Sequence, residues 1–434
     1  MRATSGDEEE NILRRFRFFA TTETVTPNWF KVRRILAFDR VSQIVKFALE
    51  KNLSENATDN LTLLFEKLND VSGNSALSYY EIDEVEYDDV LNIFVRVNSS
   101  GTYLSKTDLL FSTIVSYWKG GRDAMENLLA EINRAGNGFS FGTDFLMRGC
   151  LVLSDSPINL KIESFKKTNV MSVSKEWEKI ADSFRKLVSF LTESGYEDSY
   201  ITSYNALLPI LYYFHKGGKL TVDNLREFKK YLAVAQIKNL FGVASNAAIS
   251  KTRDALQRID CRKTAFSLEL FKEITLVGNR NFFVDEGTLE MCFEYDLGPY
   301  TFMLLSILYP DIKMNQVKWH QDHLHPASGF ENRKIKSLNL EKKVVERWQR
   351  ERNRLFNLQI LVDTENESKN DTPLIEWVNK GNDFRFRPDN CSLELENFDV
   401  FQRERKKLMK EYLRRAMGLN DSDKTAAPKT ENGF

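Results

Sequence analysis

The histidines of this 434-residue chain are concentrated in one short segment. Three of the four, His320, His323 and His325, lie within six residues, with Asp322 between them, while His215 lies about a hundred residues upstream. A neutral imidazole near pH 7 can take a proton from water or bind a metal ion, because its unperturbed pKa is about 6.5. The segment from Trp319 to Pro326 therefore indicates where chemistry takes place.

Polar residues that complement this segment follow downstream. Asn357 lies in the run LFNLQIL, and Asn366 and Lys369 lie in the run ENESK. Hydrolysis of a phosphodiester with one metal needs oxygen ligands for a hard cation, a base for the attacking water and room for the phosphate. The carboxylate of Asp322, the imidazole of His323 and the downstream amides supply these parts.

A zinc site is the alternative use of the same histidines. Imidazole is a preferred zinc ligand, and the run His320-x-x-His323-x-His325 offers three of them. A binuclear centre would need further distant histidines, and the chain offers only His215. A mononuclear three-histidine site stays open.

The order Asp-His-x-x-Pro, then Asn, then Asn-x-x-Lys resembles an HNH (ββα-metal) nuclease site. This resemblance implies that Asp322 and Asn366 are ligands of Mg²⁺ or Mn²⁺ and that His323 is the general base. It further implies that Asn357 orients His323 or braces the loop.

Two further roles follow from the same resemblance. Lys369 would contact the phosphate of the scissile strand, and Pro326 fits the turn after the Asp-His pair. His325 would stabilise charge on the leaving group or pack beside the turn.

Local patterns predict the elements that hold these residues. Alternation favours a strand over 317–323 and a second strand over 357–362, and Asp371-Thr372-Pro373 opens a helix through Leu374 and Trp377. The order is thus strand, long insertion, strand, helix.

Most of the first 300 residues read as helix. We predict helices over 174–195, capped by Ser174 and Gly195, over about 222–241, and over 204–215 with a kink at Pro209. His215 is expected to pack at the end of the last of these.

A second motif spans Asn92 to Leu110, with the sequence NIFVRVNSSGTYLSKTDLL. Its residues predict a helix end, a polar turn and a new helix capped near Ser105. It resembles the Phe-x-Arg-x-Asn-x-x-Gly-x-x-Leu-Ser signature of the GmrSD-type restriction family. In that family a ParB/sulfiredoxin-like nucleotide-hydrolysing domain is joined through helices to a C-terminal HNH nuclease, and the resemblance covers about 80–400.

The chain departs from that family in one respect: it contains no Asp-Gly-x-x-Arg motif. We therefore do not expect nucleotide hydrolysis, and we expect the N-terminal helices to expose an apolar patch that binds a partner subunit or a second copy. The expected domains are a remnant of the ParB-like/helical domain (1–115), a helical domain (116–300), the HNH domain (301–417) and a disordered tail (418–434).

Charge is balanced overall but not locally. The formal net charge is −1, whereas 312–354 contains eleven Lys or Arg against five Asp or Glu. A second basic run, 403–415, has seven Lys or Arg and two Glu on a helical pattern with Phe401, Leu408 and Tyr412 inward. That run is either a solvated helix face or a contact to the DNA backbone.

The remaining composition excludes other classes. There is no long apolar run or signal peptide, so we expect no membrane association and a cytoplasmic location, and the four scattered cysteines are expected to be buried thiols. The expected fold is mainly α, with a small C-terminal α+β HNH domain. The expected function is cleavage of double-stranded DNA, expected to be modified, in restriction or phage defence; the alternative is a catalytically degenerate protein of the same fold that binds DNA or a subunit.

Overall fold

The computed structural model describes residues 30–69, 106–312 and 318–419. The chain divides into two compact units, Met1–Tyr87 and Asp88–Phe434. The expected disorder at the two chain ends, the turn of the segment Asn92–Leu110 and the Ser105 cap fall outside the described residues.

The described part of the first unit is a small helical cluster. It contains η1 (Val32–Ala37), α2 (Val41–Glu50) and α3 (Glu55–Leu68), and Ser54 caps α3 by accepting a hydrogen bond from the Ala57 amide at 3.3 Å. Its core is Ile35, Ile44, Leu61 and Phe65. Other apolar side chains of the cluster are exposed, namely Val32, Leu36, Val45, Leu49 and Leu63. An exposed apolar surface was expected on these N-terminal helices.

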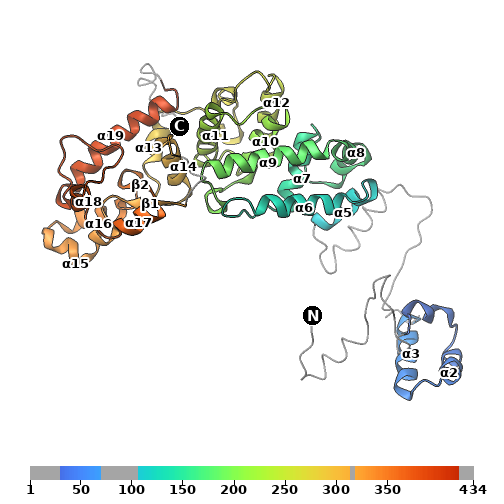
Figure 1. The fold of residues 1–434 in the computed structure, drawn as a ribbon. Coiled ribbons are helices and arrows are strands. Elements are labelled where there is room, and N and C mark those ends of the chain that lie inside the picture. Colours follow the sequence, from blue (N-terminus) through green and yellow to red (C-terminus); the bar gives the residue numbers. More distant parts are fainter. Residues whose placement is uncertain (1–29, 70–105, 313–317, 420–434) are drawn as a thin grey trace, which may run out of the picture. The chain divides into compact units, whose positions relative to one another are not determined.

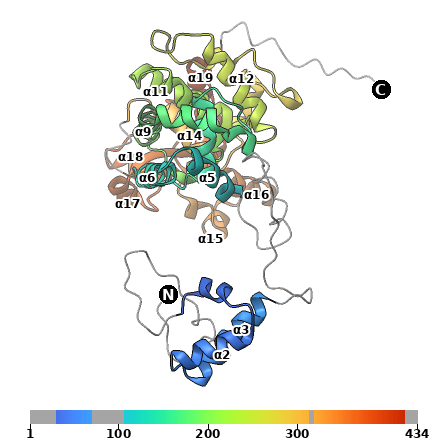
Figure 2. The same cartoon turned by 90° about the vertical axis from the view of Figure 1, so that its right-hand side faces the viewer.

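Helices dominate the second unit (Figure 1). Its longer helices before the sheet are α5 (Lys106–Tyr117), α6 (Gly121–Asn133), α7 (Thr143–Leu153), α8 (Lys167–Lys175), α9 (Trp177–Glu193), α10 (Leu208–His215), α11 (Val222–Ile237), α12 (Ser245–Gln257), α13 (Glu286–Cys292) and α14 (Pro299–Leu308). Short 3-10 turns connect several of them: η2 (Ile162–Phe165), η3 (Asp198–Tyr200), η4 (Tyr204–Leu207), η5 (Leu268–Phe271) and η6 (Val277–Asn279). Figure 2 looks at the unit from the side of α5 and α6.

The helices predicted upstream are present with shifted ends. α9 buries Ile180, Phe184 and Leu187 as the apolar spacing requires, but Ser174 is not its cap, because α8 continues to Lys175 and α9 begins at Trp177. The predicted helix from Val222 begins there and ends at Ile237.

Pro209 starts a helix instead of bending one. It lies in the first turn of α10, where its missing N–H leaves no intrahelical bond unmade, and η4 precedes it. The helix ends at His215, and Gly217 follows with a φ of 96°, in the left-handed region that favours glycine. His215 is buried at the helix end, as expected.

One two-stranded antiparallel sheet is present among the described residues, formed by β1 (Trp319–His323) and β2 (Leu358–Val362). The long insertion between them holds η7 (Ala327–Phe330), α15 (Asn332–Ile335), η8 (Lys336–Leu338), α16 (Lys342–Glu351) and η9 (Leu355–Asn357). After β2 come α17 (Asp363–Lys369), the predicted α18 (Leu374–Asn379), η10 (Leu395–Asn397) and α19 (Phe398–Ala416). The predicted order of strand, insertion, strand and helix is confirmed, with α17 as an additional helix directly after β2.

α19 ties the sheet to the preceding helices. Its fully buried Arg405 donates to the carbonyls of Phe356 (2.8 Å) and Leu358 (3.1 Å), at the start of β2. α14 packs against both α11 and α19, and one hydrophobic core runs from Leu110 to Leu419. The domain boundaries near 115 and 300 stay predictions.

Most cations of α19 are paired within the protein. Lys406 and Lys410 bind Glu290 of α13, Lys410 and Arg414 bind Glu286 of the same helix, and Arg403 and Lys407 bind Glu404. The inward residues also differ from the prediction, because Phe401 is buried but Leu408 is exposed, and Arg405, Met409 and Leu413 take the buried positions. Lys406, Lys410 and Arg414 therefore join α19 to α13, whereas Arg403 and Lys407 are paired within α19.

The remaining general expectations concern helix content, thiols and membranes. The described chain is mainly helical, as predicted, and its four cysteines are free, three of them buried and Cys391 half-buried. Within residues 30–69, 106–312 and 318–419, no helix combines the length and apolar character needed to span a bilayer.

Candidate active site

The hairpin places Asp322 and His323 on opposite faces of the sheet, because successive side chains in a strand alternate. Asp322 pairs with Gln359 and His323 with Leu358 in the antiparallel register. The Gln359 amide donates to Oδ2 of Asp322 at 3.0 Å, so this cross-strand neighbour orients the carboxylate.

α17 follows β2 directly and contacts both strands. Its last residue, Lys369, is fully buried, and its Nζ lies 3.0 Å from Oδ2 of Asp322. The same amine donates to the carbonyl oxygen of His323. A contact from Lys369 to a substrate phosphate would require the amine to leave both partners.

The half-buried His323 has its own partner on a different segment. Its Nε2 lies 2.8 Å from Oδ1 of Asn353, just before η9. If that oxygen is the acceptor, the proton sits on Nε2 and the lone pair of Nδ1 is available to accept a proton. Burial lowers the pKa of His323, while Asn353 and the Asp322 carboxylate act in the opposite direction. The imidazole is thus neutral near pH 7, which is the form a general base needs.

Sequence reasoning did not find Asn353. It lies thirty positions after His323 in sequence, inside a charged run (ERNR) that carries no pattern of its own. A fold is needed to bring the two together.

Asn357 is fully buried and braces the loop that follows β1. Its side-chain oxygen accepts from the His325 amide at 3.0 Å, and its amide donates to the carbonyls of His325 (3.1 Å) and Arg352 (2.7 Å). The Leu324 amide also donates to the Asn357 carbonyl at 2.7 Å. Of the two roles expected for Asn357, bracing the loop matches these contacts.

His325 packs in the core beside the turn. Its ring lies edge-on to Phe398 and Phe401, with centroid distances of 5.6 and 4.7 Å, and its Nε2 has no hydrogen-bond partner among the described residues. Burial lowers its pKa to about 3, so it is neutral. Since the ring is buried, stabilisation of a leaving group is not a role this position allows, and packing is the alternative that fits.

Asn366 is half-buried on α17, three residues before Lys369. Residues three apart lie on the same side of a helix. Asn366 therefore shares the side of α17 from which Lys369 reaches Asp322, which is where a second oxygen ligand would be required.

The three clustered histidines do not converge on one point. His320 and His323 are on opposite faces of β1, and His325 is in the core. Nε2 of His320 lies 2.5 Å from Oδ1 of Asp363, the first residue of α17. Across the described part of the chain no group of three or more His, Cys, Asp or Glu side chains is arranged to hold a metal, so the three-histidine zinc alternative lacks the geometry it needs.

A basic surface lies on the insertion next to this hairpin. α15, η8 and α16 carry exposed cations, which we call the insertion cations: Arg333, Lys334, Lys336, Lys342, Lys343 and Arg350. α16 is anchored through Trp348 and Arg347, both bound to Asp399 at 2.8 and 2.6 Å. The insertion that carries Asn353 to His323 therefore also presents a group of positive charges, and its helix α16 is held against Asp399 of α19.

A search of protein-family models and a search of curated proteins both found no match for this chain.

Proposed function

We propose that this chain is a metal-dependent endonuclease that hydrolyses phosphodiester bonds in double-stranded DNA, with an HNH (ββα-metal) site. The observation that carries the proposal is the β1–β2–α17 arrangement. It joins Asp322 and His323 at the end of one strand to the helix that bears Asn366, in the order that the resemblance requires.

The donor set fits a hard cation. Asp322 supplies a carboxylate and Asn366 an amide oxygen, and both described contacts of Asp322 fall on Oδ2, which leaves Oδ1 for a ligand bond. Oxygen ligands favour Mg²⁺ or Mn²⁺ over zinc. When bound there, such an ion would stabilise negative charge on the scissile phosphate.

The protein's own part in hydrolysis is a proton transfer. Neutral His323 accepts a proton at Nδ1 from a water molecule while the water oxygen forms a bond to phosphorus, and the bond from phosphorus to the leaving sugar oxygen breaks. Asn353 holds the ring in the required orientation from the other side. The insertion cations supply charge for the DNA backbone, which dominates binding to duplexes.

A catalytically degenerate protein of the same fold is the second candidate. The observation in its favour is the buried Lys369, whose ammonium already neutralises the carboxylate that would bind the metal. Binding of DNA or of a subunit without cleavage would then be the function.

The resemblance to the GmrSD-type family adds a biological setting to the proposal. It suggests modification-dependent restriction or anti-phage defence, and it rests mainly on the segment Asn92–Leu110, of which the structure describes the part from Lys106.

Cleavage assays test the proposal. Purified protein is incubated with supercoiled plasmid, modified and unmodified, in the presence of Mg²⁺, Mn²⁺ or a chelator. We expect nicking or linearisation that needs the metal and stops with chelator. DNA binding without any cleavage under all these conditions would support the degenerate protein instead.

A further inference from the structure

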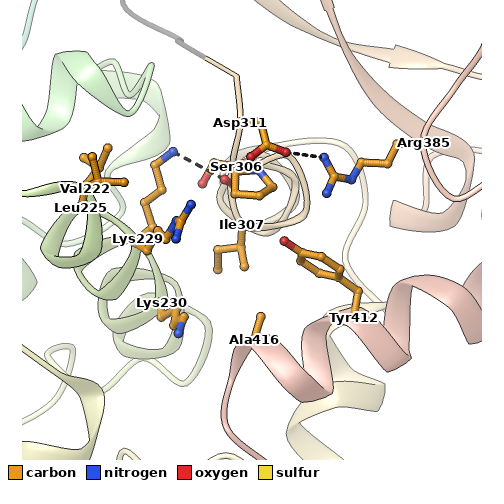
Figure 3. A pocket seen from close by; sticks show the side chains of 12 residues that line it. Val222, Leu225, Lys229, Lys230, Ser306, Ile307, Asp311, Arg385, Tyr412 and Ala416 are labelled. Carbon is orange, nitrogen blue, oxygen red and sulfur yellow. Dashed lines mark hydrogen bonds and ion pairs between the residues drawn. The ribbon is translucent and has the colours of Figure 1, made fainter.

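A cavity of about 400 Å³ lies between α11, the end of α14 and the C-terminal helix α19 (Figure 3), and none of the residues that line it belongs to β1 or β2. Its walls come from α11, the end of α14 with the following Pro310 and Asp311, Arg385 and the last turns of α19. A volume of this size is in the range of small-molecule sites.

Lys229 of α11 is the unusual side chain of this cavity. Its exposed fraction is 4%, and its Nζ has one described partner, the Ser306 carbonyl oxygen, at the long distance of 3.5 Å. No carboxylate pairs with it among the residues that the structure describes. A buried ammonium without an anion is costly, so a bound anion would compensate a real deficit.

Burial alone lowers the pKa of Lys229, to about 8. The amine therefore still carries a proton over most of the population at pH 7, and it keeps its affinity for anions.

Other cations line the same cavity. Arg226, Lys230 and Arg385 face it, against one acidic lining residue, Asp311. Asp311 is 3.2 Å from Arg385, Lys230 is 2.6 Å from Glu227, and the one ion pair of Arg226 among the described residues is with the exposed Asp223 at 3.9 Å. The lining therefore keeps an excess of positive charge at Lys229, as suits an anion, and Arg226 adds a weakly paired second cation.

Apart from Ser306, the rest of the lining is mainly apolar. Leu225 and Ile307 lie next to the basic groups, and the Tyr412 ring faces Arg385, whose guanidinium carbon lies 5.5 Å from the ring centroid (Figure 3). An inorganic phosphate ion would leave this apolar part of the cavity empty.

We propose that this cavity binds a small phosphate ester, with Lys229 and Arg226 on the phosphate and the apolar lining around Leu225, Ile307 and Tyr412 on the organic group. The proposal does not depend on nuclease activity, because none of these residues belongs to the hairpin site.

Calorimetric titration of the full chain at low ionic strength tests the site, with AMP, inorganic phosphate and adenosine as probes. We expect saturable binding of AMP, weaker binding of inorganic phosphate and none of adenosine. Lys229→Met should weaken AMP binding about 10- to 100-fold, the usual effect of losing a charge-assisted hydrogen bond. Lys219→Met, an exposed lysine just before α11, is the matched control and should bind like the wild type.

Arg226→Gln is a second variant that tests the site even if Lys229→Met does not fold. The Arg226 side chain is half exposed, so its replacement should leave the core intact. It should weaken AMP binding as well. Absence of saturable AMP binding, or unchanged affinity in both variants, would overturn the proposal. Equal affinities for AMP and adenosine would contradict the proposed contact of Lys229 and Arg226 with the phosphate. Equal affinities for AMP and inorganic phosphate would contradict the proposed role of the apolar lining in binding the organic group.

Discussion

At the scale of single residues, the Asp322 carboxylate has two competing uses. Lys369 neutralises it in this structure, at 3.0 Å, whereas the proposed function requires it to bind a divalent cation. A positive charge at that distance opposes a metal ion at the same carboxylate. If Asp322 binds a metal as proposed, we expect Lys369 to affect both the stability of the metal-free protein and its affinity for the ion.

Lys369→Met should separate these two effects. Without metal we expect the free energy of unfolding to fall by about 1–3 kcal/mol, less than for a fully buried pair, because Asp322 keeps Gln359 and some solvent. Added Mn²⁺ should stabilise this variant more than the wild type. Urea unfolding with and without Mn²⁺ measures both, and a variant with wild-type stability and an unchanged response to Mn²⁺ would contradict this reading of the pair.

The lowered pKa values of two buried histidines lead to a prediction of how the free energy of unfolding depends on pH. Burial lowers the pKa of His215 to about 4 and that of His325 to about 3 in the folded protein. At neutral pH the 3.6 Å approach of Glu176 to His215 is thus a contact with a neutral ring and not an ion pair. The unfolded chain binds these protons near pH 6.5, so their contribution to stability is complete above about pH 6.5 and is lost as the pH falls.

Below about pH 6.5 each of these histidines should cost about 1.4 kcal/mol of stability per pH unit. His325→Met, which also removes the unpartnered Nε2, should flatten the decline between pH 7 and pH 5 while leaving the slope above pH 7 unchanged. Urea unfolding across this range provides the measurement. The same decline in the variant and the wild type would show that His325 is not held neutral.

At the scale of elements, the insertion between the strands is expected to hold DNA. Lys342→Gln combined with Lys343→Gln should weaken binding to any duplex to a similar extent. The slope of a plot of the logarithm of the DNA-binding constant against the logarithm of the salt concentration should become shallower by about one unit for each phosphate that the variant no longer neutralises. Binding titrations at several salt concentrations test this, with Lys119→Gln, an exposed lysine just after α5, as the control. Unchanged salt dependence in the double variant would place the DNA elsewhere.

The spacing of apolar residues predicted those helices and strands whose own sequence carries a clear pattern. The helix from Leu374 and the start of α11 at Val222 are where the residue pattern predicts them, and β2 begins at Leu358, one residue after its predicted start. α17 was missed because DTENESK has no apolar repeat, and it is held instead by the contact of Lys369 with Asp322. Residues whose role depends on a distant partner, such as Asn353 and Arg405, could not be assigned from sequence.

In the candidate site too, features that depend on nearby sequence could be predicted, and features that depend on distant packing could not. The order of Asp322, His323, Asn357 and Asn366 could be read from the sequence, and the structure shows how Asn357 braces the loop. The burial of His325 and Lys369 could not be read, since both depend on how α18 and α19 cover the hairpin. The types and order of polar residues in the sequence indicate a candidate site. Whether each of their side chains is exposed depends on packing across the whole domain.

At the scale of the whole molecule, the N-terminal unit raises the question of association. Leu36 and Leu49 have exposed fractions of 68% and 74%. Such apolar exposure marks interaction surfaces. We expect the purified chain to be self-associated, and Leu36→Asp with Leu49→Asp to shift it to the monomer. Light scattering behind size exclusion measures the mass, and a wild type that is monomeric at all concentrations would contradict self-association through this surface.

Nucleotide hydrolysis is not expected from this chain, because the Asp-Gly-x-x-Arg motif is absent. Phosphate release from the four ribonucleoside triphosphates should stay at the level of the buffer. Robust release of phosphate would contradict this expectation.

The role of His323 is the central claim, and its loss is the most direct test. In a time course of plasmid cleavage with Mg²⁺ or Mn²⁺, His323→Ala should be slower by about 10²- to 10⁴-fold while DNA binding is nearly unchanged, because the base acts on water and not on the duplex. His320→Ala, on the other face of the same strand, is the matched control and should keep most of the activity. Cleavage by His323→Ala at the wild-type rate would contradict the assignment of this site.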